Sequence, residues 1–79
     1  MIGIILKTMR KNAELKQEAI AKEIKVARNT LSQYETETIH PTFDTIEKIA
    51  TACDYSIIFL NNRTNEAINY KNLLRENKK

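Results

Sequence analysis

The chain contains few of the residues that usually build chemical sites: one cysteine, one glycine, one proline and one histidine in 79 residues, and no tryptophan. Cys53 cannot form an internal disulfide, and its place on an apolar helical face favours a small buried side chain. His40 has no second histidine, cysteine or carboxylate at ligand spacing, so we expect a surface residue and no metal site. A single glycine provides no phosphate-binding loop, and no catalytic triad can be assembled. The composition therefore predicts a protein that is not an enzyme and uses no cofactor.

Long hydrophobic runs are also missing. The apolar run at residues 2–6 is too short for a membrane span or a cleavable signal, and Lys7, Arg10 and Lys11 follow it at once. We therefore expect a cytoplasmic protein with no membrane partner. A chain of this length buries only about 60% of its unfolded surface. The sequence thus predicts one small domain with a thin core, which a partner subunit would help to stabilise.

The net charge of +3 is distributed unevenly along the chain. Residues 1–34 carry seven Lys or Arg and three Asp or Glu (+4), residues 35–60 carry one and five (−4), and residues 61–79 carry five and two (+3). The basic first part suits phosphate binding, and we expect the acidic middle part to face away from nucleic acid. Solvated charged faces would give the same pattern, so charge alone favours no partner.

The best organised stretch runs from residue 17 to residue 35, where two helical patterns are joined by a very short connection. The apolar residues that share a face are Ile20, Ala21 and Ile24 in the first helix and Leu31 and Tyr34 in the second. Only Lys25 and Val26 lie between the two faces, so the second helix must turn sharply and pack across the first. The outward edge of the second helix is polar and carries Arg28, Asn29, Ser32 and Gln33.

In its order of residue types this stretch resembles the helix-turn-helix of the phage-repressor-like Xre family, which includes the lambda and 434 repressors and Cro. The resemblance covers about residues 4–54 and is carried by Leu15, Gln17, Ile20-Ala21, Val26, Leu31-Ser32, Tyr34-Glu35, Pro41, Ile46 and Ile49-Ala50. It implies an all-α (mainly) fold, a lambda-repressor-like bundle of four to five helices. It also implies binding of double-stranded DNA, with a recognition helix at about residues 27–35 in the major groove.

The resemblance places five residues of the recognition helix against bases. Asn29 and Gln33 lie four positions apart, and each amide can exchange hydrogen bonds with adenine. Arg28 can contact guanine or a phosphate, and Thr30 or Ala27 can touch a thymine methyl group. We therefore expect this helix to read the DNA sequence.

Other residues are expected to contact the DNA backbone. Lys16 and Gln17 begin the preceding helix, whose N-terminus favours a phosphate. The loop residues that can donate to phosphate include Thr36, Thr38 and His40. Ser32 is the least certain member of the polar edge and has no assigned role.

The resemblance also implies an ion pair between Arg10 and Glu35, which would join the first helix to the end of the recognition helix. The sequence departs from the family at three positions. Lys16 and Ala27 stand where capping Thr and Ser residues are usual, and each missing cap costs about 1 kcal/mol. Lys25 replaces the usual turn glycine and is predicted to have positive φ, at a cost of roughly 1 to 2 kcal/mol. We therefore expect a marginally stable domain.

Further helices are predicted on either side of this stretch. Apolar residues at helical spacing predict a first helix at about residues 3–12 and a fourth from residue 43 to residue 53, with Thr42 as its cap. Residues 36–42, which include the only proline, are predicted to form the intervening loop.

After Asp54 the residues favour a short strand, because four consecutive apolar residues include β-branched and aromatic side chains. A lone strand needs a partner, so we predict that it pairs antiparallel with the same strand of a second subunit. The predicted dimer interface is Ser56, Ile57, Ile58, Phe59 and Leu60. This segment resembles the HipB-type antitoxins, although a fifth helix, or neither element, is also compatible with the pattern.

The sequence divides into a DNA-binding domain at residues 1–60 and a C-terminal extension at residues 61–79. The extension is predicted to be helical from Asn65 to Arg75, with Ala67, Tyr70 and Leu74 on one side. Three functions remain open: a transcriptional repressor that binds a palindromic operator as a homodimer, an antitoxin that also binds a toxin protein, and a helical interaction module without DNA binding.

Overall fold

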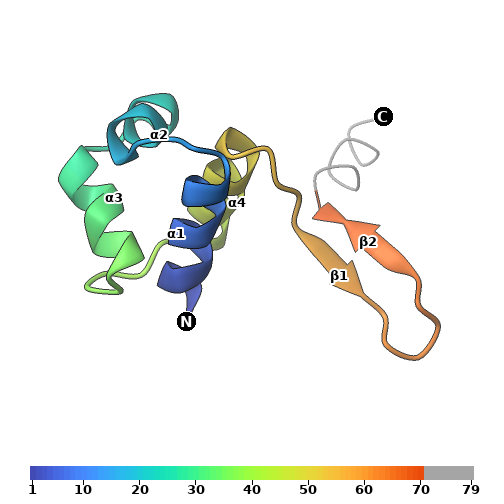
Figure 1. The fold of residues 1–79 in the computed structure, drawn as a ribbon. Coiled ribbons are helices and arrows are strands. Elements are labelled where there is room, and N and C mark those ends of the chain that lie inside the picture. The colour runs from blue at the N-terminus through green and yellow to red at the C-terminus, as the bar shows by residue number, and fades with distance from the viewer. Residues whose placement is uncertain (71–79) are drawn as a thin grey trace.

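The structure, a computed structural model, describes residues 1–70, in which four helices precede two short strands. The helices are α1 (Ile2–Asn12), α2 (Gln17–Ile24), α3 (Arg28–Glu35) and α4 (Phe43–Ala52), and the strands are β1 (Ile58–Leu60) and β2 (Ala67–Asn69). Figure 1 shows the helices gathered into a bundle, with the two strands at one side of it. The mainly helical fold class predicted from the sequence is confirmed, with four helices in the bundle.

The core lies between the helices and takes side chains from all four. Its buried members are Leu6, Met9, Ile20, Ala21, Leu31, Ile49, Ala50 and Cys53. Leu6 and Leu31 are fully buried, and the small side chain of Ala21 on α2 is buried as well. Burial raises the pKa of the Cys53 thiol, which agrees with the prediction of a small buried hydrophobic residue.

A tight turn joins α2 to α3 and fixes their crossing. Lys25 has φ 63° and ψ 47°, the left-handed conformation predicted for this position. Its N–H donates to the carbonyl of Lys22 at 3.3 Å, and the N–H of Val26 donates to the carbonyl of Ala21 at 2.9 Å. This pair of bonds is a Schellman motif, which satisfies the last carbonyls of α2 although the residue at its centre is not glycine.

The helix N-termini differ in how they are capped. At α4 the N–H of Thr45 donates to Thr42 Oγ1 at 3.2 Å, so the predicted cap is present. At α2 and α3 the cap positions are Lys16 and Ala27, and no side chain caps either helix. The first amides of both helices therefore remain available to an external acceptor.

The segment after α4 confirms one sequence prediction and corrects another. The strand predicted after Asp54 is present as β1, and it pairs antiparallel with β2 of the same chain, with Phe59 opposite Ile68. Pairing of β1 with a second subunit stays a prediction. The helix expected from Asn65 is replaced at residues 67–69 by β2. Its expected continuation through Leu74 to Arg75 lies outside the described residues.

The reversal of the chain explains this difference. The side-chain oxygen of Asn61 accepts hydrogen bonds from the N–H groups of Arg63 and Thr64, at 2.9 and 3.3 Å, and this turns the chain back along β1. Backbone groups of residues 67–69 then pair with β1. A helix with only a narrow apolar stripe would have left the edge of β1 unpaired on this side.

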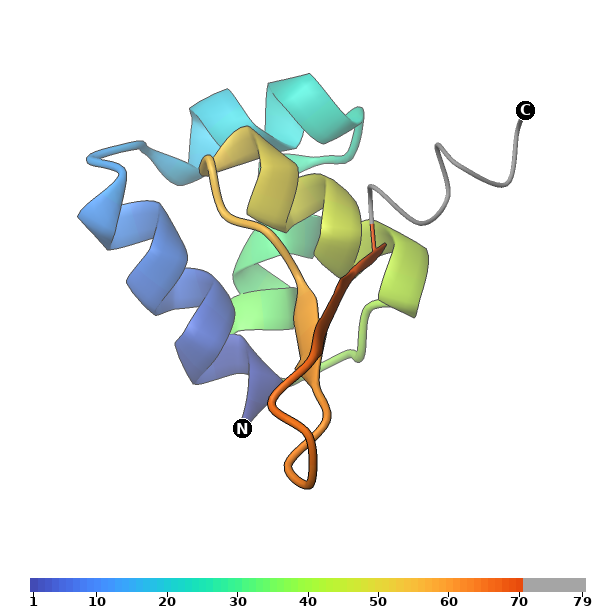
Figure 2. The same cartoon turned by 90° about the vertical axis from the view of Figure 1, so that its right-hand side faces the viewer.

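Aromatic contacts attach the hairpin to the bundle. The ring of Phe43, the first residue of α4, stacks on Phe59 with centroids 6.2 Å apart and makes a T-shaped contact with Tyr70 with centroids 4.9 Å apart. The hydroxyl of Tyr70 donates to Asp44 at 3.4 Å. Figure 2, turned by 90°, shows the hairpin lying in front of α4 and beside α1. No helix within residues 1–70 is long and apolar enough to span a membrane.

Candidate nucleic-acid interface

Two rows of polar side chains run along α3. Arg28, Ser32 and Thr36 follow one another at intervals of four and border a hollow in the surface. Asn29 and Gln33 form the adjacent row, one residue further round the helix. Arg28 and Asn29, near the N-terminus of α3, are exposed, whereas Ser32 and Gln33 are half-buried.

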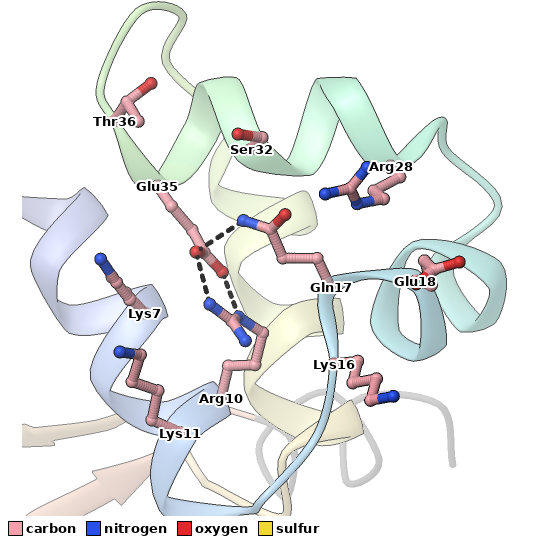
Figure 3. Close-up of a pocket in the computed structure, with 10 residues that line it drawn as sticks. All are labelled: Lys7, Arg10, Lys11, Lys16, Gln17, Glu18, Arg28, Ser32, Glu35 and Thr36. Atoms are coloured by element: carbon pink, nitrogen blue, oxygen red, sulfur yellow. Dashed lines mark hydrogen bonds and ion pairs between the residues drawn. The ribbon is translucent and has the colours of Figure 1, made fainter.

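The hollow has a volume of about 550 Å³ and lies between α1, the start of α2, and α3. Five of its lining residues are basic: Lys7, Arg10, Lys11, Lys16 and Arg28. The remaining lining residues are Gln17, Glu18, Ser32, Glu35 and Thr36. In Figure 3 the lysines of α1 stand on one side of the hollow and Arg28 stands on the other. The hollow therefore places an excess of positive charge beside the polar rows of α3.

A hydrogen-bonded network forms one wall of the hollow. Arg10 donates from Nε to Glu35 Oε2 at 2.7 Å and from Nη2 to Glu35 Oε1 at 3.0 Å, which is the pair that the family resemblance implies. A further bond from Arg10 Nη1 reaches the carbonyl of Leu15 at 3.1 Å. Gln17 donates from Nε2 to Glu35 Oε1 at 3.0 Å (Figure 3). Together these bonds join α1, the start of α2 and the end of α3.

The network keeps Glu35 charged although its side chain is only 3% exposed. Burial by itself raises the pKa of Glu35, but the hydrogen bonds from Arg10 and Gln17, with the charges of Arg10 and Lys7, bring the pKa below its ordinary value. The hydrogen bond to Glu35 raises the pKa of Arg10. Since Glu35 neutralises Arg10, the free positive charge of the hollow is carried by its lysines and Arg28.

The start of α2 adds a second attraction for anions. Without a side-chain cap, its first-turn amides and the positive end of its dipole face outward beside Lys16. Glu18 also lies in this first turn and offsets part of that charge. The arrangement can hold the oxygens of a nucleic-acid backbone, because amides and ammonium groups are the donors that phosphates accept from.

The structure places some of the expected DNA-contacting residues beside the hollow and others away from it. Lys16, Gln17, Arg28 and Thr36 line it, but the amide nitrogen of Gln17 is already engaged by Glu35. Ala27 is exposed at the start of α3, and Thr30 is half-buried in its first turn. Thr38 and His40 are exposed in the loop after α3, where Thr36 and Thr38 hydroxyls share a hydrogen bond of 2.9 Å.

Sequence reasoning missed Lys7 and Lys11 as members of this surface, and it assigned no role to Ser32. The two lysines are four positions apart on the polar side of α1, so the sequence did contain the signal that they share a face. The sequence does not show which element lies next to that face of α1. Only the packing of α1 against α3 shows this.

A pair of short helices joined by a tight turn, with a polar edge on the second helix and basic groups beside it, defines a helix-turn-helix DNA-binding protein. The chain belongs to the Xre-like helix-turn-helix family, because the family model described as HTH_3, helix-turn-helix, matches residues 6–60. No curated protein and no solved structure gives a significant match.

Proposed function

We propose that this protein is a sequence-specific transcriptional regulator that binds a palindromic operator as a homodimer and represses transcription in the cytoplasm by occupying a promoter. The observation that supports this function is the position of Arg28, Asn29 and Gln33. They lie on α3 directly beside a basic hollow at the uncapped start of α2.

The two parts of this surface, α3 and the basic hollow, have different roles in DNA binding. With α3 in the major groove, the amides of Asn29 and Gln33 meet base edges, and Arg28 meets guanine or the backbone. The backbone beside the groove passes the hollow, where Lys7, Lys11 and the start of α2 attract its phosphates. Base contacts then supply specificity, while the lysines supply affinity that does not depend on sequence.

A dimer distinguishes DNA sequences better than a single α3 helix can. One short helix contacts only a few base pairs, whereas two copies related by a two-fold axis read two half-sites about 34 Å apart. The proposed dimer interface is the segment Ser56–Leu60, whose apolar side chains are largely exposed within residues 1–70.

The experiment that tests this function is the selection of bound duplexes from a random pool at moderate salt, followed by sequencing. An enriched palindrome with half-sites one helical turn apart is expected. If the folded protein enriches no sequence, the regulator is rejected and the polar edge of α3 becomes a surface for another protein. Enrichment of a single half-site would reject the dimeric operator alone.

A further inference from the structure

Glu37, just after α3, has a backbone conformation that is unusual for a glutamate. Its φ is 62°, in the left-handed region that favours glycine. Its N–H donates to the carbonyl of Tyr34 at 3.3 Å, and the N–H of Thr38 donates to the carbonyl of Gln33 at 2.9 Å. These two bonds form a Schellman motif at the end of α3, in which glycine or asparagine usually occupies the left-handed position. A glutamate that bears this steric cost is expected to make a contact that offsets it.

The side chain of Glu37 extends from the end of α3 to the first turn of α1. A Cβ on Gly3 would lie 2.7 Å from Cγ of Glu37, so the glycine leaves the space that this side chain occupies. The carboxylate accepts a hydrogen bond from the amino group of Met1 and forms an ion pair with it. Glu37 is therefore half-buried, although the residues on either side of it are exposed.

The start of α1 suits a carboxylate from elsewhere in the fold. No acidic residue lies in its first turn, and the side chain at its cap position does not bond to its amides. Glu37 supplies the negative charge that the positive end of this helix favours. The bond from the Met1 amino group lowers the pKa of Glu37 most, and the N–H of Gly3 and the nearby His40 lower it further, against a rise from burial.

The residues around Glu37 are the expected phosphate contacts of the loop after α3. The hydroxyls of Thr36 and Thr38 lie 2.9 Å apart, so they share one side of the loop, while the side chain of Glu37 between them reaches α1. Thr36 also lines the basic hollow (Figure 3). A carboxylate that faced the same way as these hydroxyls would repel the phosphates that they are expected to bind.

We propose that Glu37 is a positioning residue for DNA binding. By binding the first turn of α1, its carboxylate fixes residues 36–40 so that the hydroxyls of Thr36 and Thr38 face the DNA backbone. This inference rests on the proposed function and deepens it, because it names the residue that holds part of the phosphate-binding surface in place. Glu37 itself does not touch the nucleic acid. It reduces the conformational entropy that an exposed loop loses when it binds.

The proposal predicts an effect opposite in sign to that of simple charge repulsion. Removing a negative charge near bound DNA normally strengthens binding, because the protein then repels the phosphates less. Glu37→Gln removes the charge with little change in size, and it loosens the loop because a neutral amide binds the end of α1 more weakly than a carboxylate does. This variant is expected to weaken binding to all duplexes by about 2- to 12-fold, the equivalent of one hydrogen bond, with unchanged base preference.

The matched control is Glu18→Gln, the same substitution at an exposed residue in the first turn of α2. Glu18 lines the basic hollow, so this variant removes a negative charge from the DNA-binding surface without altering the loop. It should strengthen binding by about twofold. Binding titrations at equal salt compare the two variants with the wild type. Ethylation of single phosphates should show that Glu37→Gln loses contacts beside the loop and keeps those beside α2.

A second variant, Glu37→Gly, separates positioning from stability. Glycine adopts φ 62° without steric cost, so this variant should be at least as resistant to urea as the wild type, although its loop has lost the contact with α1. Its affinity for all duplexes should nevertheless fall, as in Glu37→Gln. Binding as tight as that of the wild type by either Glu37 variant, or a loss confined to one base position, overturns the proposal.

Titration of the Glu37 carboxyl group by NMR tests the contact with α1 without DNA. A pKa below the ordinary value of 4.5 is expected, and a pKa at or above that value overturns the contact. A wild-type protein that selects no duplex rejects the regulator and the positioning role together. A wild-type protein that selects a palindrome, with undiminished binding by Glu37→Gln, rejects the positioning role alone.

Discussion

Gly3 packs directly against the backbone carbonyl of Glu35, so that the first turn of α1 meets the last turn of α3 without any side chain between them. A Cβ at Gly3 would collide with the carbonyl oxygen of Glu35 and with Cγ of Glu37. The collision with Glu35 involves backbone, which no change of rotamer can relieve. The only glycine in the chain therefore stands where α1 and α3 are in close contact, and it does not have a positive φ.

The first prediction is that Gly3→Ala destabilises the protein. Alanine favours a helix over glycine by about 1 kcal/mol, but we expect the forced displacement of α3 to outweigh this and to cost about 1–3 kcal/mol. Urea unfolding measures the change. The control is Lys11→Ala, an exposed position on the same helix, where a change within about 0.5 kcal/mol is expected. A Gly3→Ala protein as stable as the wild type would contradict the close approach.

The second prediction concerns acid. Because the pKa of Glu35 is lowered in the folded protein, the folded state binds fewer protons than the unfolded state at acidic pH. The contribution of Glu35 is therefore fully present above the ordinary carboxyl pKa of 4.5 and is lost as the pH falls through the lower folded value. The free energy of unfolding should decrease accordingly between pH 5 and about pH 3.

The comparison for this profile is a protein in which both partners are replaced, Arg10→Met with Glu35→Leu. Replacing one partner leaves a buried charge unpaired, which costs about 3–5 kcal/mol, whereas replacing both is far milder. We expect the double variant to lose less stability than the wild type over the same acidic range. Identical pH profiles would show that Glu35 contributes nothing to the acid dependence.

The third prediction uses the left-handed turn. Lys25→Gly should raise the free energy of unfolding by about 1 kcal/mol, because glycine adopts φ 63° without the steric cost that lysine bears there. Lys22→Gly, an exposed change of the same type inside α2, should lower it by about 1 kcal/mol. Thermal or urea unfolding distinguishes the two. Equal effects would mean that the strain at Lys25 is not significant.

The fourth prediction separates base reading from general affinity. Gln33→Ala should cost about 1–3 kcal/mol of binding free energy on the preferred duplex and relax the preference at one base position. Binding titrations on the preferred duplex and on duplexes changed at single positions provide the measurement. If all duplexes are weakened equally, Gln33 does not read a base.

The fifth prediction concerns the lysines of α1. Replacing Lys7 and Lys11 by Gln should weaken all duplexes alike and reduce the slope of log affinity against log salt by about 2, since each phosphate contact contributes about 0.9. Lys48→Gln is the control, because Lys48 is exposed on α4 and does not line the hollow. An unchanged salt slope in the double variant would place the DNA backbone elsewhere.

Much of the helical part of this fold follows from local pattern. Ile20, Ala21 and Leu31 are buried as their spacing predicts. The positive φ of Lys25 was predicted from the family resemblance, which places a turn glycine at that position, and the structure has φ 63° there. These features depend on residues close together in the sequence, where periodicity carries most of the information.

Of the two strands of the hairpin, only β1 could be predicted from the sequence. Residues 57–60 are four apolar residues in a row, which identified β1, but Ala67 and Ile68 form a shorter apolar run that fits a helix or a strand equally well. A polar turn after residue 60 was visible in the sequence, but not that Asn61 folds the chain back along β1 by accepting backbone hydrogen bonds. The hydrogen bond of Gln17 to Glu35 was beyond reach for a different reason, because it depends on tertiary packing.

The separation of charge along the chain becomes a separation in space. The lysines and Arg28 of the hollow lie on α1, at the start of α2 and on α3, whereas Asp44 and Glu47 lie on α4, which Figure 1 shows at the side of the bundle away from α3. Such a molecule has a permanent dipole moment, and the field of a polyanion exerts a torque on it. In the proposed mode of binding, this torque turns the protein so that α3 leads as it diffuses toward DNA, and a larger share of encounters becomes productive. The proposed mode therefore gives the acidic residues of α4 a contribution to the rate of association without any contact to a base or phosphate.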